Sequence, residues 1–223
     1  METNMSAHLL HSIDPLKKQA ETGSMGDGLS PMDPPDAYAP PSTMSVDPAA
    51  MHPFLRKFME EHVSFMKELA SFEEAILCVQ KTGFTKELDQ KLRHFFHFFD
   101  QEFATHSHRE EVTLFPLLGK RFLDKGEHHV GATTTPVDMM EDDHHKAVQL
   151  AAVILNFLGL TFRLPDERSK LVVLDAALEE GKQLVELLRL HIFREDHILF
   201  PMAHQLISPP EFDAMSSMVS IKK

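Results

Sequence analysis

Four long stretches of apolar residues at helical spacing, separated by short breaks, occupy the chain from about residue 50 onward. They run from about Pro53 to Gln80, from about Thr85 past Pro116 to about Leu123, from about Val137 to Leu160, and onward from Pro165-Asp166. Apolar positions that recur every three or four residues line one face of an α-helix. No alternating pattern typical of a strand occurs. Long amphipathic helices with short connections predict an all-α fold, an antiparallel up-down-up-down four-helix bundle.

The composition divides the chain into three segments. Residues 1–49 contain the proline-rich run Met32–Pro41 and no apolar periodicity, so we expect a flexible, disordered tail that offers a surface to a protein partner. Residues 50–207 form the predicted bundle. Residues 208–223 are expected to be a short terminal helix and tail, because Ser208 is a favourable N-cap and proline follows it.

Charge and cysteine content exclude several classes of protein. The formal net charge of −12 disfavours nucleic acid and anionic membranes as partners, because both require clustered Lys and Arg. Cys78 is the only cysteine, so neither an internal disulfide nor a thiolate metal cluster is expected. No secretory leader or spanning segment is recognised, which predicts a cytoplasmic protein.

A paired motif carries the chemistry. His106-Ser-His-Arg-Glu110 and His191-Ile-Phe-Arg-Glu195 are each followed at the same distance by Leu-Phe-Pro. Residues four apart on a helix differ by about 40° in azimuth, so each His and Glu share a face, and that face is otherwise leucine and phenylalanine. Burying such groups without a partner costs several kcal/mol, roughly, whereas a metal accepts imidazole lone pairs and neutralises carboxylates.

A weaker repeat precedes each motif. Met59-Glu-Glu-His62 resembles Met140-Glu-Asp-Asp-His144 with one residue inserted, and each His lies on an apolar stripe. The predicted metal ligands are therefore His62, His106, Glu110, His144, His191 and Glu195. Two carboxylates that bridge two metals about 3.5–4 Å apart would complete a two-metal site. A nitrogen and oxygen ligand set suits iron or manganese and suits structural zinc poorly.

Most other histidines are expected to lie off the ligand face. His145 adjoins His144 and is the one alternative to it. By angular position on their helices, the following are predicted not to bind metal: His94, His97, His108 and His197.

Pro116 and Pro201 fall inside helical patterns just beyond the two glutamates. A proline removes one backbone hydrogen bond and kinks or ends a helix. Two interpretations stay open, namely a kink that splays the metal end of the bundle and simple helix termination.

The doubled H-x-x-x-E-[ED]-x-x-L-F-P motif, with a histidine ahead of each copy, resembles the hemerythrin-like cation-binding family over about residues 50–207. The resemblance implies an antiparallel four-helix bundle and a carboxylate-bridged pair of iron ions, oxo- or hydroxo-bridged, with the six ligands named above. Oxygen-carrying hemerythrins have H-x-x-x-H on the third helix, but here Val148 stands four residues after His144. The four-His, two-Glu set is closer to iron-centre repair proteins and iron-sensing hemerythrin domains.

A ferritin-like site needs Glu-x-x-His on two helices, and only Glu141-Asp-Asp-His144 fits, which disfavours that architecture. The resemblance implies a non-haem di-iron protein that binds or senses O2, NO or peroxide at open iron positions. The alternatives are a redox enzyme or iron donor, acting in peroxide or NO removal or in the repair of damaged iron centres, and an iron-responsive interaction module.

Overall fold

The computed structural model describes residues 46–126 and 135–221, and within those ranges every regular element is a helix. The prediction of an all-α fold is confirmed. The tail predicted for residues 1–49 falls almost entirely outside the described residues, as do His128 and His129.

The first two predicted stretches form a helical hairpin. Its first arm is α3 (Pro53–Thr82), which begins with His52 as N-cap, since its ring nitrogen accepts a hydrogen bond from the Phe54 N–H. It ends at Gly83, whose φ of 79° lies in the region that favours glycine. The second arm is one continuous run of short helical pieces. These are α4 (Lys86–Phe98), η3 (Phe99–Phe103), α5 (Ala104–Arg109), η4 (Glu110–Leu114) and α6 (Phe115–Lys125).

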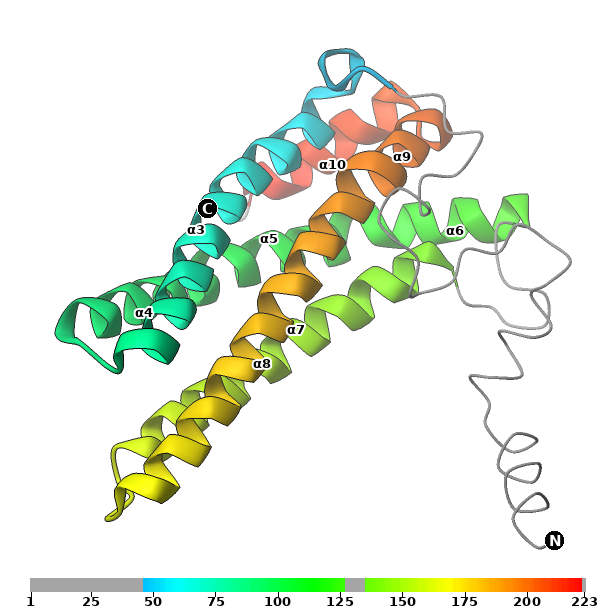
Figure 1. Cartoon of the computed structure of the whole chain (residues 1–223). Helices are drawn as coiled ribbons and strands as arrows, with labels where there is room; N and C mark the ends of the chain where they lie inside the picture. Colours follow the sequence, from blue (N-terminus) through cyan, green and yellow to red (C-terminus); the bar gives the residue numbers. More distant parts are fainter. Residues whose placement is uncertain (1–45, 127–134, 222–223) are drawn as a thin grey trace, which may run out of the picture. The chain divides into compact units, whose positions relative to one another are not determined.

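The second hairpin repeats this plan (Figure 1). Its first arm, α7 (Pro136–Thr161), begins with a capping box between Thr135 and Asp138. Asp166 caps the second arm, which consists of α8 (Glu167–Arg194), η5 (Glu195–Leu199) and α9 (Phe200–Leu206). The antiparallel helices α7 and α8 lie against each other along much of their length, and α8 also contacts α3, which joins the two hairpins.

Neither proline ends its helix. Single π-helical turns, Glu110–Leu114 and Glu195–Leu199, come directly before the segments that contain Pro116 and Pro201. A π-turn shifts the backbone pairing by one residue, and such turns occur often at functional sites. Simple termination is therefore the wrong interpretation. Each bridging glutamate of the predicted site is the first residue of such a turn.

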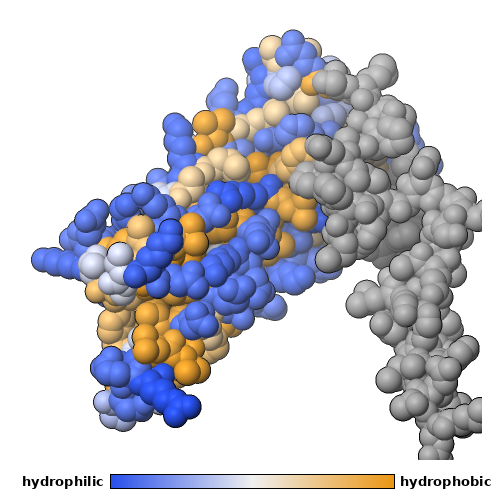
Figure 2. Space-filling view, viewed as in Figure 1, coloured by the Kyte–Doolittle hydropathy of each residue, from blue (hydrophilic) through white to orange (hydrophobic). Residues whose placement is uncertain are grey.

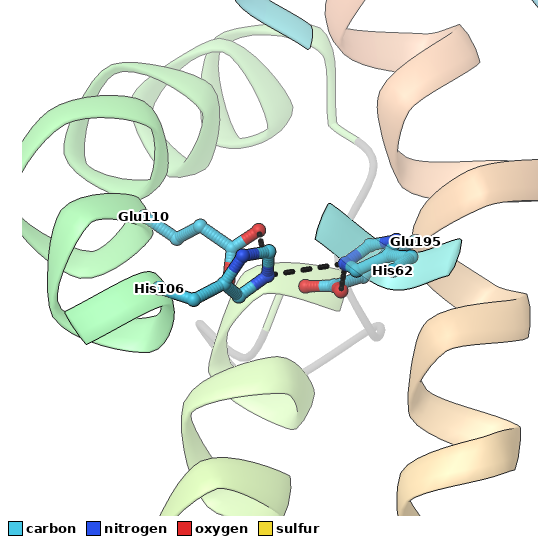
Figure 3. A group of neighbouring side chains, drawn as sticks. All are labelled: His62, His106, Glu110 and Glu195. Carbon is cyan, nitrogen blue, oxygen red and sulfur yellow. Dashed lines mark hydrogen bonds and ion pairs between the residues drawn. The ribbon is translucent and has the colours of Figure 1, made fainter. Parts of the chain in front are cut away.

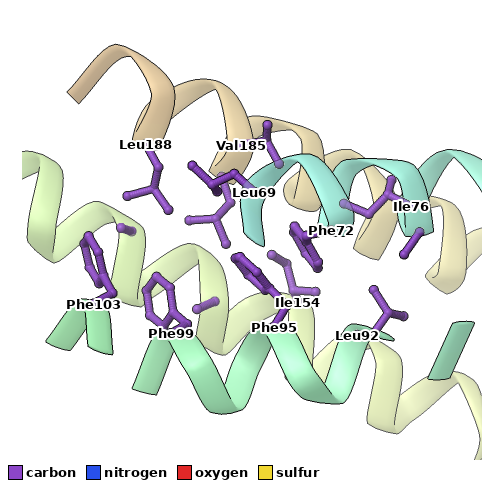
Figure 4. Packing of buried hydrophobic residues seen from close by; sticks show 14 of the residues in the cluster. Leu69, Phe72, Ile76, Leu92, Phe95, Phe99, Phe103, Ile154, Val185 and Leu188 are labelled. Atoms are coloured by element: carbon purple, nitrogen blue, oxygen red, sulfur yellow. The ribbon is translucent and has the colours of Figure 1, made fainter. Parts of the chain in front are cut away.

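Two clusters of buried apolar residues occupy the interior of the bundle. One lies on the side of the α3–α4 and α7–α8 connections and includes Leu69, Phe72, Phe95, Ile154 and Leu188 (Figure 4). The other lies on the opposite side of the predicted ligands and includes Phe58, Phe115, Met140 and Phe200. Along each helix the ligands stand between the two clusters, so they are enclosed by apolar side chains at both ends. Met66 lies at the edge of the apolar stripe of α3 and is 39% exposed.

The short C-terminal helix is present as α10 (Pro209–Ile221), and the Ser208 backbone N–H and hydroxyl both donate to Glu211 at its start. Phe212 and Met215 are buried in the second cluster, and α10 contacts α3 and the π-turn η4. A single 3-10 turn, η2 (Pro48–Ala50), precedes the bundle. The helix α10 therefore packs against two of the elements that carry predicted ligands, α3 and η4.

Polar residues cover most of the face shown in Figure 2, with apolar side chains between them. Apolar residues also reach the surface near the connection between α7 and α8, where Phe162, Leu171 and Val172 are each more than 60% exposed. No helix in the described ranges combines the length and the apolarity that a membrane span requires.

Candidate metal centre

All six predicted ligands meet at one place inside the bundle. His62 comes from α3, His106 from α5 and Glu110 from η4, while the second hairpin supplies the remaining three from α7, α8 and η5. Their exposed fractions lie between 0 and 3%: His62, His106, Glu110, His144, His191 and Glu195. The sequence repeat therefore becomes a pair of matching half-sites that face each other.

The six residues form two overlapping groups, each with one ligand atom per residue, and those atoms lie within 4.8 Å of one another. The first group contains His62 and His106 (Figure 3), and the second contains His144 and His191. Both groups share Glu110 and Glu195. Within each group the two Nε2 atoms lie 3.1 Å apart and so face a common point.

Each shared glutamate lies beside one histidine of each group. The carboxylate of Glu110 is 3.4 Å from His106 Nε2 and 3.6 Å from His144 Nε2. The carboxylate of Glu195 is 3.2 Å from His62 Nε2 and 3.3 Å from His191 Nε2. Two carboxylates in this position match the bridging role that a two-metal site requires.

The carboxylate oxygens provide a test of whether metal ions fit. All four oxygens of Glu110 and Glu195 are buried and lack a hydrogen-bond partner. Leaving buried charged groups unpaired costs about 3–5 kcal/mol. Divalent cations between the carboxylates and the four Nε2 atoms would satisfy every one of these atoms. The residues present therefore fit a pair of cations, and their nitrogen and oxygen donors suit iron or manganese.

Four further acidic residues surround the site, and the sequence interpretation did not include them. Three accept a hydrogen bond at 2.8 Å from the outer nitrogen, Nδ1, of a candidate ligand: Asp196 pairs with His62, Glu61 with His106, and Glu111 with His144. The fourth, Asp143, lies 3.6 Å from the Nδ1 of His191. Such outer partners fix the tautomer and orientation of a ligating imidazole.

A signal for these acids was available in the sequence. Each is the neighbour of a predicted ligand, either directly before a histidine (Glu61, Asp143) or directly after a glutamate (Glu111, Asp196). An acid before a histidine serves the other histidine of its own hairpin, and an acid after a glutamate serves a histidine of the other hairpin. Only the folded structure shows which histidine each acid contacts.

An arginine holds one acid in each hairpin. Arg109 donates through both terminal nitrogens to Glu61, while Arg194 donates one hydrogen bond of 3.0 Å to Asp143. Burial would raise the pKa of Glu61, but the hydrogen bonds from His106 and Arg109 lower it to about 2. Glu61 is therefore an ionised acceptor at any physiological pH. Each arginine stands three residues after a ligand histidine, a second repeat feature that sequence inspection passed over.

Without metal, protons must balance the charge of the centre. Burial opposes a charge on His62, but its hydrogen bond to Asp196 and the adjacent carboxylate of Glu195 raise its pKa to about 9. Burial likewise opposes a charge on His191, but the nearby carboxylates of Glu195 and Asp143 raise its pKa to about 9. The two histidines beside Glu195 therefore carry protons at neutral pH.

The two histidines beside Glu110 behave in the opposite way. Burial lowers the pKa of His106 to about 4 and also lowers the pKa of His144. Burial and the neighbouring Glu195 carboxylate raise the pKa of Glu110 well above its usual value. For Glu195, burial is outweighed by His191 and His62, which hold its pKa well below the usual value. Metal binding would replace the protons that this arrangement retains.

The other histidines lie where their angular positions predict. His145 is exposed, so the alternative ligand to His144 points away from the centre, and the helix adds no further ligand because Val148 is 53% exposed. The remaining histidines predicted not to bind metal are likewise exposed: His94, His97, His108 and His197.

A helical bundle that places four histidines and two carboxylates around two adjacent points defines a metal-cation-binding protein. A comparison with protein families agrees: the model of the hemerythrin HHE cation binding domain matches residues 53–203. The chain belongs to this family, as the paired motifs indicated. Searches of curated proteins and of solved structures found no match.

Proposed function

We propose that this centre binds two iron ions and that the iron pair binds or senses a small ligand, namely O2, NO or peroxide. The four buried carboxylate oxygens without hydrogen-bond partners are the observation that carries the proposal. With four imidazoles they provide an oxygen and nitrogen ligand set for two metals, and no thiolate contributes. Iron in such a site supplies redox chemistry and an open position for an exogenous ligand.

The surroundings of the centre support a small ligand. A cavity of ≈ 20 Å³ touches His62, His106 and His191, and its other walls are phenylalanine, leucine and isoleucine side chains. A cavity this small favours a ligand of a few atoms over a larger organic substrate. The apolar wall offers no hydrogen bond to water, which favours an apolar diatomic molecule over water next to the metals.

The first test is metal analysis with optical spectra. Protein loaded with iron under anaerobic conditions should hold two ions per chain and should develop a charge-transfer band when O2 or NO is added. A band that disappears when the gas is removed indicates binding or sensing. Steady consumption of peroxide or NO indicates an enzyme instead, and manganese as the bound metal would contradict the iron assignment. Uptake of fewer than two metals would contradict the two-metal centre itself.

A further inference from the structure

The two half-sites differ at the outer nitrogen of one histidine. His62 and His106, in the first group, each donate a hydrogen bond of 2.8 Å from Nδ1 to an acid. In the second group His144 does the same, but the Nδ1 of His191 is buried and has no hydrogen-bond partner. Its nearest acid, Asp143, stands 3.6 Å away, beyond hydrogen-bond range.

The cause is a difference of one methylene group. Glu61 and Asp143 stand at matching positions, each directly before a candidate ligand and each facing the histidine of its partner helix. The longer side chain of Glu61 reaches His106 while it accepts two hydrogen bonds from Arg109. The shorter Asp143 is held by a single hydrogen bond from Arg194 and stops short of His191.

Burial gives this gap an energetic consequence. His191 is 1% exposed and the Asp143 side chain 11%, so bulk water is not free to replace the missing partner. An outer-nitrogen partner orients a ligating imidazole and makes it a stronger donor, and loss of such a partner typically weakens metal binding about 10–100-fold. One of the four imidazoles therefore binds its metal without this support.

We infer that the two metals are not equivalent and that the ion bound by His144 and His191 leaves first. This inference rests on the proposed two-iron centre. The ion bound by His62 and His106 has a hydrogen-bonded partner behind both imidazoles and is the retained one. Both histidines of that group line the apolar cavity, whereas only His191 of the second group does so. Under this inference the second position exchanges its metal, and the first position has more of its ligands beside the cavity.

The test measures iron release from full-length protein. Wild-type protein loaded with Fe(II) under anaerobic conditions is mixed with an excess of a chromophoric Fe(II) chelator, and the absorbance is followed. Two phases of one iron each are expected, with rates that differ about 10–100-fold. Asp143→Glu should slow the fast phase toward the slow one. Glu61→Asp, which copies the short side chain into the first half, should accelerate the slow phase toward the fast one.

A matched control is available beside the test position. Asp142 is exposed, so Asp142→Glu makes the same substitution one residue away and should leave both phases unchanged. If Asp143→Glu fails to fold, Glu61→Asp by itself still tests the inference, because a shorter side chain does not crowd its neighbours. Two irons released in a single phase by the wild type, or phases that neither substitution alters, would overturn the inference and leave the two-iron centre standing. Uptake of fewer than two irons by the wild type would overturn both.

Discussion

The two halves of the metal centre are near copies, which makes their differences informative. Each half offers two histidines, an arginine three residues after the second histidine, a glutamate after that arginine, and an acid next. In both halves a π-helical turn begins at the glutamate and precedes a proline. The shared features are those that would hold a metal: inward nitrogens, carboxylates between the two groups of histidines and a helix register that directs them inward.

The differences lie behind and beside the ligands. An additional π-turn, η3, interrupts the helix before His106, whereas α8 is regular up to Arg194. Phe99 and Phe103 of that turn line the cavity, to which α7 contributes no residue. The Glu61 and Asp143 difference distinguishes the halves a second time. A duplicated scaffold can therefore keep its candidate metal ligands while the outer partners and the cavity beside the ligands diverge.

Loss of a bridging glutamate is expected to have the largest effect, because Glu110 and Glu195 each lie beside one histidine from both halves. Glu110→Ala or Glu195→Ala should remove at least one of the two metals and lower the melting temperature of the metal-loaded protein. Metal analysis and calorimetry measure both quantities. Glu186→Ala, at an exposed position on α8, is the control. A glutamate variant that keeps two metals would contradict the bridging assignment.

The second prediction concerns pH and involves one histidine from each half. His62 and His191, one from each half, have pKa values of about 9 in the metal-free protein, so at neutral pH each incoming metal must displace a proton. Affinity should therefore rise with pH up to about 9, by up to about tenfold per pH unit for each proton displaced. Binding titrations at several pH values, with a pH indicator in weak buffer, measure both effects. Metal uptake without proton release would contradict this charge distribution.

The two arginines give an intermediate, unequal effect. Arg109→Gln removes two hydrogen bonds from Glu61, the partner of His106, and should accelerate metal release by about tenfold. Arg194→Gln should have a smaller effect, because His191 already lacks a hydrogen-bonded acid. Release kinetics with a chelator compare them, and Arg93→Gln, at an exposed position, serves as control. A larger effect at Arg194 would reverse the proposed order of the halves.

The smallest effect is expected for His145→Ala. This side chain is exposed beside a buried neighbour, His144, so its loss should leave the metal content at two and change stability by less than about 0.5 kcal/mol. Metal analysis and thermal unfolding measure it. Loss of a metal from this variant, with an unchanged metal content in His144→Ala, would mean that His145 and not His144 is the metal ligand on α7.

Much of the fold followed from periodicity and caps. The apolar stripes of the four long stretches and the cap at Ser208 are local features, determined by neighbours in the chain, and the structure contains them. The π-turns before Pro116 and Pro201 were not predicted as such. A proline signals a disturbance of the helix, but how the backbone absorbs it depends on the packing around that turn.

The sequence by itself determined which residues form the centre, because spacing of four residues on an apolar face places His106 with Glu110 and His191 with Glu195 whatever the tertiary contacts. Only the tertiary structure decided how the halves combine. An acid next to one ligand supports a histidine on another helix, and the one-methylene gap at Asp143 exists only because α7 and α8 set its distance from His191. The distance between two packed helices depends on all the side chains between them. A difference of less than an ångström at one hydrogen bond therefore cannot be predicted from the sequence alone.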